Sequence, residues 1–338
     1  MTTPLTEIST PTTTRAALPG REGGNLVLRE ETVPGLDAGE VLVRVHAAGV
    51  NRADLLHATG TYQQAARKPG SPNVAGMELA GEVVAVGRSE DSDLLGGRVM
   101  AMHPGSFAEY AVVDARLLLP VADGVRPTDA AALPIGLMTE YDALVALADA
   151  QPGEVCVITA ATSGVGLVGV QVAKQRGLTV VAMSRSAKSG AVLEPLGADM
   201  VATNLAEVHQ AYPGGVNVVL DHVGGSLLTE LLGDLASGAR VVSVGRLAGG
   251  ATEIELNGFA AKRATLIGTT WRTRTLDEIA EAALRLGTNG GRNPLPLDLT
   301  PVVGSVVPLD RIEGLLRQIE KPRKPGKIIV SMLDKGSE

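Results

Sequence analysis

The sequence predicts an α/β protein of about two domains, in which a β-rich part is followed by a parallel sheet covered by helices. A length of 338 residues favours about two domains. Between residues 25 and 120, short β-branched runs are separated by glycine, proline and aspartate, and beyond residue 155 strands and helices alternate. Hydrophobic residues make up 45% of the chain but aromatic residues only 2%, so the core must consist mainly of aliphatic side chains.

The β-rich part follows a Thr/Pro-rich segment. Residues 1–13 contain no apolar stretch, so we expect a disordered tail rather than a signal peptide. The spacing of four β-branched runs then indicates an antiparallel barrel or sandwich. These runs are "NLVLREETV" (25–33), "EVLVRVHAAGV" (40–50), "ELAGEVVAVG" (78–87) and "FAEYAVVDARLLLPV" (107–121).

The second part begins with an Ala/Leu-rich helical stretch at 127–150, for which Thr128 is the expected N-cap. The alternation that follows is typical of a parallel sheet with helices on both faces. The expected strands are 155–160, 178–184, 200–203, 216–223, 239–245 and 264–270, with a helix at 165–176. A last helix is predicted at 309–320, before a terminal strand at 326–333.

Charge and cysteine content argue against several classes of function. A net charge of −7 argues against a general affinity for nucleic acid or anionic lipid. The single cysteine, Cys156, excludes an internal disulfide and a cysteine-based zinc site, and it suits a reducing cytoplasm. No uncharged apolar run reaches the roughly 20 residues that a membrane span requires, so we expect none.

The strand–turn–helix–strand unit at 157–186 indicates a dinucleotide-binding site of the Rossmann type. Within "ATSGVG", Ala161, Ser163 and Gly166 occupy the three glycine positions of G-x-G-x-x-G. Gly166 would let the helix pack close to its strand, while Ser163 offers a hydroxyl to the pyrophosphate. Thr162, Gly164 and Val165 complete the turn, whose N–H groups would face the phosphates. The alternative is a plain strand–helix corner.

The end of the second strand of this unit predicts which dinucleotide binds. An NAD site places a carboxylate there, whereas this chain has Ser184, followed by Arg185 and Lys188. A hydroxyl and two cations would bind a 2′-phosphate, so the sequence favours NADP(H) over NAD(H). The alternative is that both cations are ordinary solvated charges. Val223, Gly245 and Arg246 end later strands, where the ligand crevice of an open α/β sheet is expected.

Seven stretches, in order, resemble a known family. Together they are similar to zinc-free medium-chain dehydrogenases/reductases of the quinone oxidoreductase (zeta-crystallin-like) branch, and most similar to the inducible quinone oxidoreductase subgroup. The stretches are 47–62, 72–87, 97–113, 130–144, 157–186, 220–225 and 324–333.

This resemblance implies a split architecture. A GroES-like catalytic domain would comprise residues 14–134 and 276–338, and a Rossmann NADP-binding domain would comprise residues 135–275. It also implies a homodimer formed through edge strands near residues 264–270. Zinc-using relatives have a metal-binding cysteine where this chain has Asn51, and the chain lacks their four-cysteine lobe, so no metal is expected.

The resemblance also assigns site residues. The Asn51 amide would lie near the nicotinamide and substrate, although a cap of a strand-to-helix turn is the alternative. Tyr62 would stand at the mouth of the substrate cleft and could supply a proton. Thr139 would approach the nicotinamide, although Glu140 beside it is atypical. Arg323 or Lys324 would reach the 2′-phosphate.

The resulting hypothesis is an NADPH-dependent reductase of quinones or α,β-unsaturated carbonyls. Without zinc, alcohol oxidation is disfavoured, whereas hydride transfer to an electron-poor acceptor is not. One alternative is a stand-alone enoyl reductase that acts on carrier-bound thioesters in polyketide-type biosynthesis. The other is a nucleotide-binding protein with little turnover.

Overall fold

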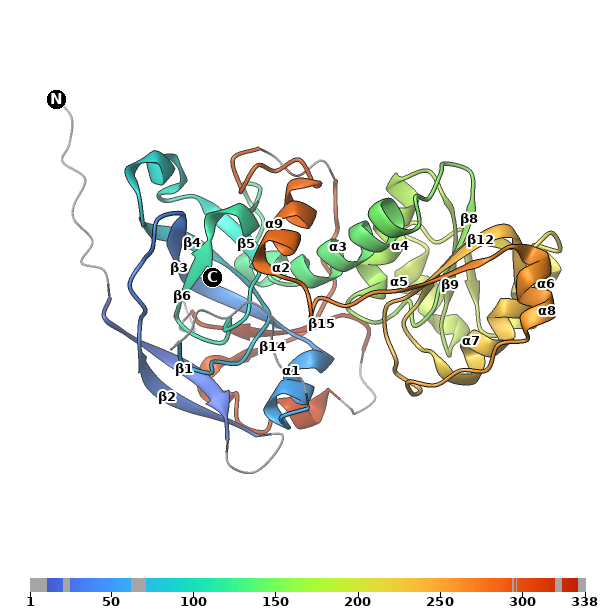
Figure 1. Ribbon diagram of the computed structural model, residues 1–338. Helices are drawn as coiled ribbons and strands as arrows, with labels where there is room; N and C mark the ends of the chain where they lie inside the picture. Colours follow the sequence, from blue (N-terminus) through green and yellow to red (C-terminus); the bar gives the residue numbers. More distant parts are fainter. Residues whose placement is uncertain are drawn as a thin grey trace.

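The computed structural model describes residues 11–20, 25–61, 71–293, 295, 297–319 and 324–333. Figure 1 shows two parts side by side, a β-rich part and a parallel sheet with helices, and α3 (Pro134–Tyr141) runs between them. The α/β fold class predicted from the sequence is confirmed. The domain boundaries at residues 134 and 275 stay predictions.

The β-rich part is organised around β3 (Glu40–Val50), which pairs with three other strands. Its sheet has the order β14-β15-β3-β4-β5-β7, and β6 also pairs with β3. The strands are β4 (Glu78–Val86), β5 (Arg98–Met102), β6 (Tyr110–Asp114), β7 (Leu119–Pro120), β14 (Val303–Pro308) and β15 (Lys327–Ser331). A separate hairpin of β1 (Thr13–Pro19) and β2 (Leu26–Thr32) packs beside it, and β1 begins within the expected tail.

The second sheet is parallel throughout and has the order β10-β9-β8-β11-β12-β13. Because the chain moves outward from β8 in both directions, a topological switch point lies between β8 and β11. The strands are β8 (Val155–Ile158), β9 (Thr179–Met183), β10 (Met200–Ala202), β11 (Val216–Asp221), β12 (Leu235–Ser243) and β13 (Thr265–Gly268).

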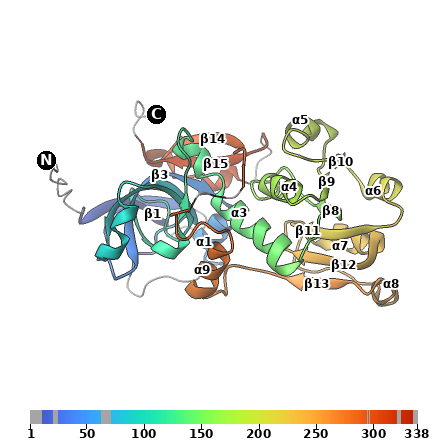
Figure 2. The same ribbon diagram turned by 90° about the horizontal axis from the view of Figure 1, so that it is seen from above.

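Helices cover both faces of the parallel sheet, as alternate strand residues show. Cys156 and Ile158 pack into the same core as α4 (Gly166–Gln175), whereas Val157 points into a second core with α6 (Leu205–Ala211). Figure 2 shows α4 and α6 on opposite sides of the sheet. The other helices are α1 (Arg52–Ala58), α2 (Pro127–Ala130), α5 (Gly190–Leu193), α7 (Gly225–Leu231), α8 (Leu256–Lys262) and α9 (Leu276–Leu284).

The structure corrects two predictions of helix ends. Thr128 is not an N-cap, because α2 begins at Pro127 with Arg126 as its cap residue. Proline is favoured at the first helical position because it has no N–H to satisfy there. The last helix, predicted at 309–320, is instead two short 3₁₀ turns, η6 (Leu309–Arg311) and η7 (Leu316–Gln318). Gly314 lies between them with a left-handed φ of 73°, which a continuous helix cannot contain.

The helical stretch Pro127–Leu147 is the one stretch in the described part of the chain that is long and apolar enough to cross a membrane. However, 72% of its most apolar window is buried inside the protein, as is usual for a core helix. It comprises α2, α3 and a π-helical turn at Asp142–Leu147.

Candidate active site

The turn after β8 fits the pyrophosphate of a dinucleotide. The N–H groups of Thr162, Gly164 and Val165 have no hydrogen-bond acceptor among the described residues, and all three residues are half-buried. A Cβ on Gly166 would lie 2.7 Å from the Ala160 carbonyl oxygen, so this glycine allows the close approach of helix and strand. Unpaired N–H groups at the start of a helix favour an anion.

One alanine and one serine replace glycines of the motif in this turn. The left-handed residue is Ala160, with a φ of 47°, and not Ala161, which stands at the first glycine position. The Ser163 hydroxyl oxygen accepts a hydrogen bond from the N–H of Gly166, the first residue of α4, at 3.0 Å, and its own O–H remains able to donate. The turn therefore keeps its shape without the glycines of the common motif.

The residues expected at the 2′-phosphate follow β9. The Ser184 hydroxyl lies 2.8 Å from that of Ser189, which anchors the start of this loop. Arg185 and Lys188 are exposed, and neither forms an ion pair within the described part of the chain. Two cations that have no carboxylate partner among the described residues therefore follow the second strand of this unit.

Asp221, the last residue of β11, fixes the loop that follows this strand and contains Val223. The sequence motifs had not indicated this role. The Asp221 carboxylate accepts hydrogen bonds from the N–H groups of Val223 at 3.0 Å and Gly224 at 2.9 Å. Its carbonyl oxygen accepts from the Gly245 N–H at 2.9 Å. Arg246 follows, and it is exposed. An aspartate directly after an apolar strand, in "LDHVGG", was the available signal.

On the other side, Asn51 belongs to a buried polar network. Its Nδ2 donates to Glu78 Oε1 at 2.7 Å, and its Oδ1 accepts from Lys327 Nζ at 2.7 Å. Lys327 and Glu78 are themselves 2.7 Å apart, and their side chains are 4% and 0% exposed. Glu78 Oε2 also accepts from the Ile135 N–H at the start of α3. Neither charged residue was among those expected from the sequence, although each stands at the start of a largely apolar strand.

Lys327 also joins this network to the turn after β8. A Cβ on Gly164 would lie 2.7 Å from Lys327 Cδ, so the lysine stem packs directly against that glycine. Strand β15 of the β-rich part thus meets the turn after β8. The contact brings Asn51 and the turn into one site.

Asp54 caps the start of α1 rather than facing the cleft. Its carboxylate accepts from the Asn51 N–H at 2.6 Å, and Asn51 itself is the N-cap residue. The Asn51 side chain does not cap, because Glu78 and Lys327 bind it. Burial raises the pKa of Asp54 to about 7, against the opposing effect of the Asn51 N–H.

Thr139 is fixed by an aromatic residue that was not among those expected from the sequence. Its hydroxyl accepts from Trp271 Nε1 at 2.9 Å. The Arg274 guanidinium lies 4.2 Å from the centroid of the Trp271 ring and donates to Asp142 at 2.6 Å. These contacts tie the segment after β13 to α3.

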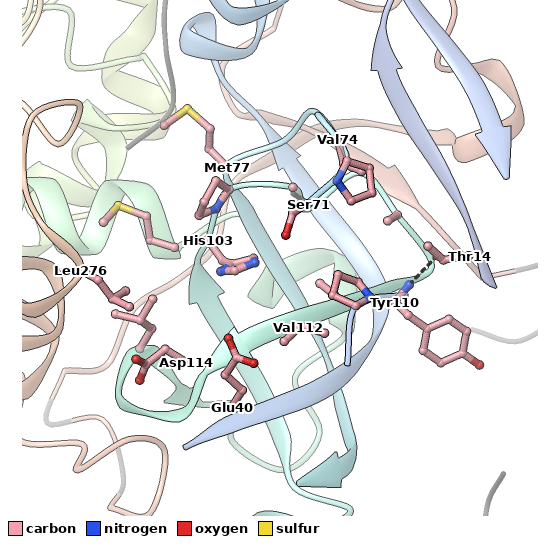
Figure 3. A pocket seen from close by; sticks show the side chains of 18 of the residues that line it. Thr14, Glu40, Ser71, Val74, Met77, His103, Tyr110, Val112, Asp114 and Leu276 are labelled. Atoms are coloured by element: carbon pink, nitrogen blue, oxygen red, sulfur yellow. Dashed lines mark hydrogen bonds between the residues drawn. The ribbon is translucent and has the colours of Figure 1, made fainter. Parts of the chain in front are cut away.

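A cavity of about 420 Å³ adjoins this arrangement. Met77, His103 and Trp271 line it, so it extends from Trp271, which binds Thr139, into the β-rich part. Figure 3 shows its lining side chains, among which the Tyr110 ring points away from the cavity. Its position beside Thr139 and its partly apolar lining are suited to an organic acceptor.

Two expected site residues, Tyr62 and Arg323, lie outside the described residues, and their roles stay predictions. Lys324 is described and exposed. Among the residues that the structure describes, no cluster of three or more histidine, cysteine, aspartate or glutamate side chains could hold a metal ion.

Comparisons with known proteins match both parts of the chain. A family model described as "Alcohol dehydrogenase GroES-like domain" matches residues 37–123, and one described as "Zinc-binding dehydrogenase" matches residues 164–288. Quinone oxidoreductase from Homo sapiens is 30% identical over 283 residues, which cover 81% of this chain and 83% of that protein. Prostaglandin reductase-3 from Bos taurus is 36% identical over 227 residues, which cover 65% of this chain but only 59% of that protein.

A solved structure supports the same assignment. The quinone oxidoreductase from Thermus thermophilus, also solved in complex with NADPH, is 33% identical with a TM-score of 0.76, and the match covers 94% of this chain and 100% of that one. The chain therefore belongs to the quinone oxidoreductase branch of the medium-chain dehydrogenase/reductase family, as its motifs predicted, and it is an oxidoreductase that uses a nicotinamide cofactor.

Proposed function

We propose that the protein is a zinc-independent reductase that transfers hydride from NADPH to a quinone or an α,β-unsaturated carbonyl. The observation that carries this proposal is the turn after β8. Its three unpaired N–H groups lie at the switch point of a doubly wound sheet, where such folds bind nucleotides. Thr162, Ser163, Gly164, Val165 and Gly166 would hold the pyrophosphate.

The preference for NADPH rests on the loop after β9. Arg185 and Lys188 would form charge-assisted hydrogen bonds with the 2′-phosphate, and Ser184 would add a hydroxyl. An Asp or Glu at this place would repel that phosphate. Arg323, from the C-terminal segment, remains an expected further contact.

Bound NADPH supplies a hydride and leaves as NADP⁺, and a proton from solvent or a side chain completes reduction of the acceptor. Thr139, oriented by Trp271, and the backbone at Val223 and Gly245 would position the nicotinamide half. Asn51 keeps one Nδ2 hydrogen for which the Gly49 carbonyl, 3.5 Å away, is only a distant acceptor. We assign that hydrogen to the nicotinamide or the acceptor.

The Asn51 network also supports chemistry without zinc. Asn51 stands where zinc-using relatives have a metal-binding cysteine. Lys327 places a buried positive charge 2.7 Å from the Asn51 side chain. A second cation beside an ammonium group would be repelled.

Tyr62, the expected proton donor, remains the residue to test for the proton transfer to the acceptor.

The protein is further proposed to be a homodimer. Strand β13 lies at the edge of its sheet, and Leu266 on it is 38% exposed. An edge strand has unpaired backbone groups that a second copy can complete. A single protomer mass in light scattering would contradict this arrangement.

The test follows NADPH absorbance in the near ultraviolet with 1,2-naphthoquinone, a simple enone and an enoyl thioester. Oxidation with the quinone or the enone supports the proposal. Turnover with the thioester alone would identify an enoyl reductase instead. Tight NADPH binding without oxidation by any of the three would identify a binding protein.

A further inference from the structure

Glu140 and His222 form a buried pair where α3 meets the loop after β11. Glu140 lies on α3 and His222 directly after β11, and Glu140 Oε1 is 2.7 Å from His222 Nε2. The two side chains are 0% and 6% exposed. Neither residue is among those to which the proposed function gives a role in hydride transfer.

The contacts of His222 show that the pair holds one proton between its members. His222 Nδ1 lies 2.8 Å from the Thr159 carbonyl oxygen, which can only accept, so Nδ1 carries a hydrogen. Nε2 then either donates to a Glu140 carboxylate or accepts from a protonated Glu140. In both cases one proton lies between Nε2 and Oε1. Without it, two lone pairs would face each other in a buried site.

The pair is linked to both sides of the proposed cofactor crevice. The His222 N–H donates to the Thr159 hydroxyl at 2.8 Å, and that hydroxyl donates to Asp221, which holds the Val223 loop. Glu140 follows Thr139, on the nicotinamide side, directly in α3.

The packing leaves Glu140 no second position. A Cβ on Gly169 of α4 would lie 2.4 Å from Glu140 Oε2, and this oxygen is buried without a hydrogen-bond partner among the described residues. The carboxyl group is therefore confined between α4 and His222.

We infer that Glu140 and His222 are positioning residues. The hydrogen bond formed by their shared proton holds α3 and the loop after β11 in the arrangement that binds NADPH. The inference rests on the cofactor site proposed above. Neither residue is among those proposed to contact the cofactor or the acceptor, so we expect the pair to act on cofactor affinity and not on hydride transfer itself.

The proton makes this arrangement dependent on pH. Burial alone would lower the pKa of His222, but the charge and hydrogen bond of Glu140, the hydrogen bond to the Thr159 carbonyl and the charge of Asp221 together raise that pKa above its usual value. Two other titratable groups act here from neighbouring strands: Asp221, whose charge adds to the rise, and Cys156, whose thiol has its pKa raised by burial and stays protonated. NADPH affinity should therefore fall on the alkaline side, as the pair loses its proton.

Glu140→Gln separates this role from a purely structural one. A glutamine amide can donate permanently to Nε2, so the variant keeps the hydrogen bond but has no proton to lose. Glu140→Ala removes the hydrogen bond that holds α3 to the loop after β11. We expect the arrangement that binds NADPH to be less populated and the dissociation constant to rise about tenfold, which equals the contribution of about one buried hydrogen bond to that arrangement. The exposed pair of His209 and Asp234, 2.9 Å apart, provides a control in Asp234→Asn.

The experiment measures NADPH dissociation constants by isothermal titration calorimetry from neutral to alkaline pH, together with kcat at saturating NADPH. We expect wild type and Asp234→Asn to lose affinity as pH rises, Glu140→Gln to keep it, and kcat to be unchanged in Glu140→Gln. If Glu140→Gln loses affinity in parallel with the wild type, or Glu140→Ala binds as the wild type does, the inference is wrong. A wild type that binds no NADPH at any pH would instead overturn the proposed function.

Discussion

Replacement of Asp54 by asparagine should remove a pH-dependent loss of stability. Asp54 is fully buried, and burial raises its pKa from 3.8 to about 7. The folded state thus keeps this proton up to about pH 7, whereas the unfolded chain releases it near pH 4. Because the unfolded state binds fewer protons in that window, stability falls as pH rises through it.

The size of the effect follows from the two pKa values. At 1.36 kcal/mol per pKa unit, the full shift corresponds to about 4 kcal/mol, of which about 3 kcal/mol is lost between pH 5 and pH 8. Asparagine is neutral at both pH values, and its side-chain oxygen can still accept from the Asn51 N–H. The variant should therefore lose about 3 kcal/mol less than the wild type over this interval.

Urea unfolding followed by circular dichroism at pH 5 and pH 8 measures this difference. Asp123→Asn, at an exposed position, is the matched control and should lose as much stability as the wild type. If Asp54→Asn and the wild type lose the same free energy of unfolding between the two pH values, the buried carboxyl is not protonated at neutral pH and the reasoning fails.

Three other changes test the site. Gly166→Ala places a Cβ 2.7 Å from the Ala160 carbonyl oxygen, so we expect a loss of about 1–3 kcal/mol in the free energy of unfolding and weaker NADPH binding. The control Gly233→Ala adds a Cβ in open space and should change neither quantity. Lys327→Met leaves Glu78 as a buried charge without its cation and should lower the free energy of unfolding by about 3–5 kcal/mol, measured by thermal unfolding. Adding Glu78→Gln should partly restore that stability, and no recovery would contradict the pairing. Dialysis against EDTA should leave NADPH-dependent quinone reduction unchanged, and a loss that zinc restores would refute the metal-free proposal.

The sequence predicted the parallel sheet better than the β-rich part, for a physical reason. Strands β8 and β9 contain the continuous apolar runs "VCVI" and "VVAM", and a turn or helix follows each of them, so local pattern defines them. Strand β1, "TTRAALP", has no such pattern, and its pairing with β2 depends on tertiary contacts. The last helix was wrongly predicted because Gly314, within an apolar periodic segment, adopts a left-handed conformation.

The same difference between local pattern and tertiary contact decides which parts of the candidate site the sequence could predict. The turn at 161–166 and the cations after β9 lie within one contiguous motif, so the sequence alone indicates them. The contacts of Asn51 with Glu78 and Lys327 join three distant segments, and no local pattern contains them. The same holds for the pairing of Glu140 with His222, 82 residues apart.

The central claim is that the crevice at the carboxyl ends of β8 and β9 binds NADPH through its pyrophosphate and 2′-phosphate. Isothermal titration of the protein with NADPH and with NADH, before and after the double change Arg185→Gln and Lys188→Gln, tests it most directly. We predict at least about tenfold tighter binding of NADPH, because charge-assisted hydrogen bonds contribute about 1.5–3 kcal/mol each, and loss of that preference in the variant. Equal or tighter binding of NADH by the unaltered protein would contradict the account.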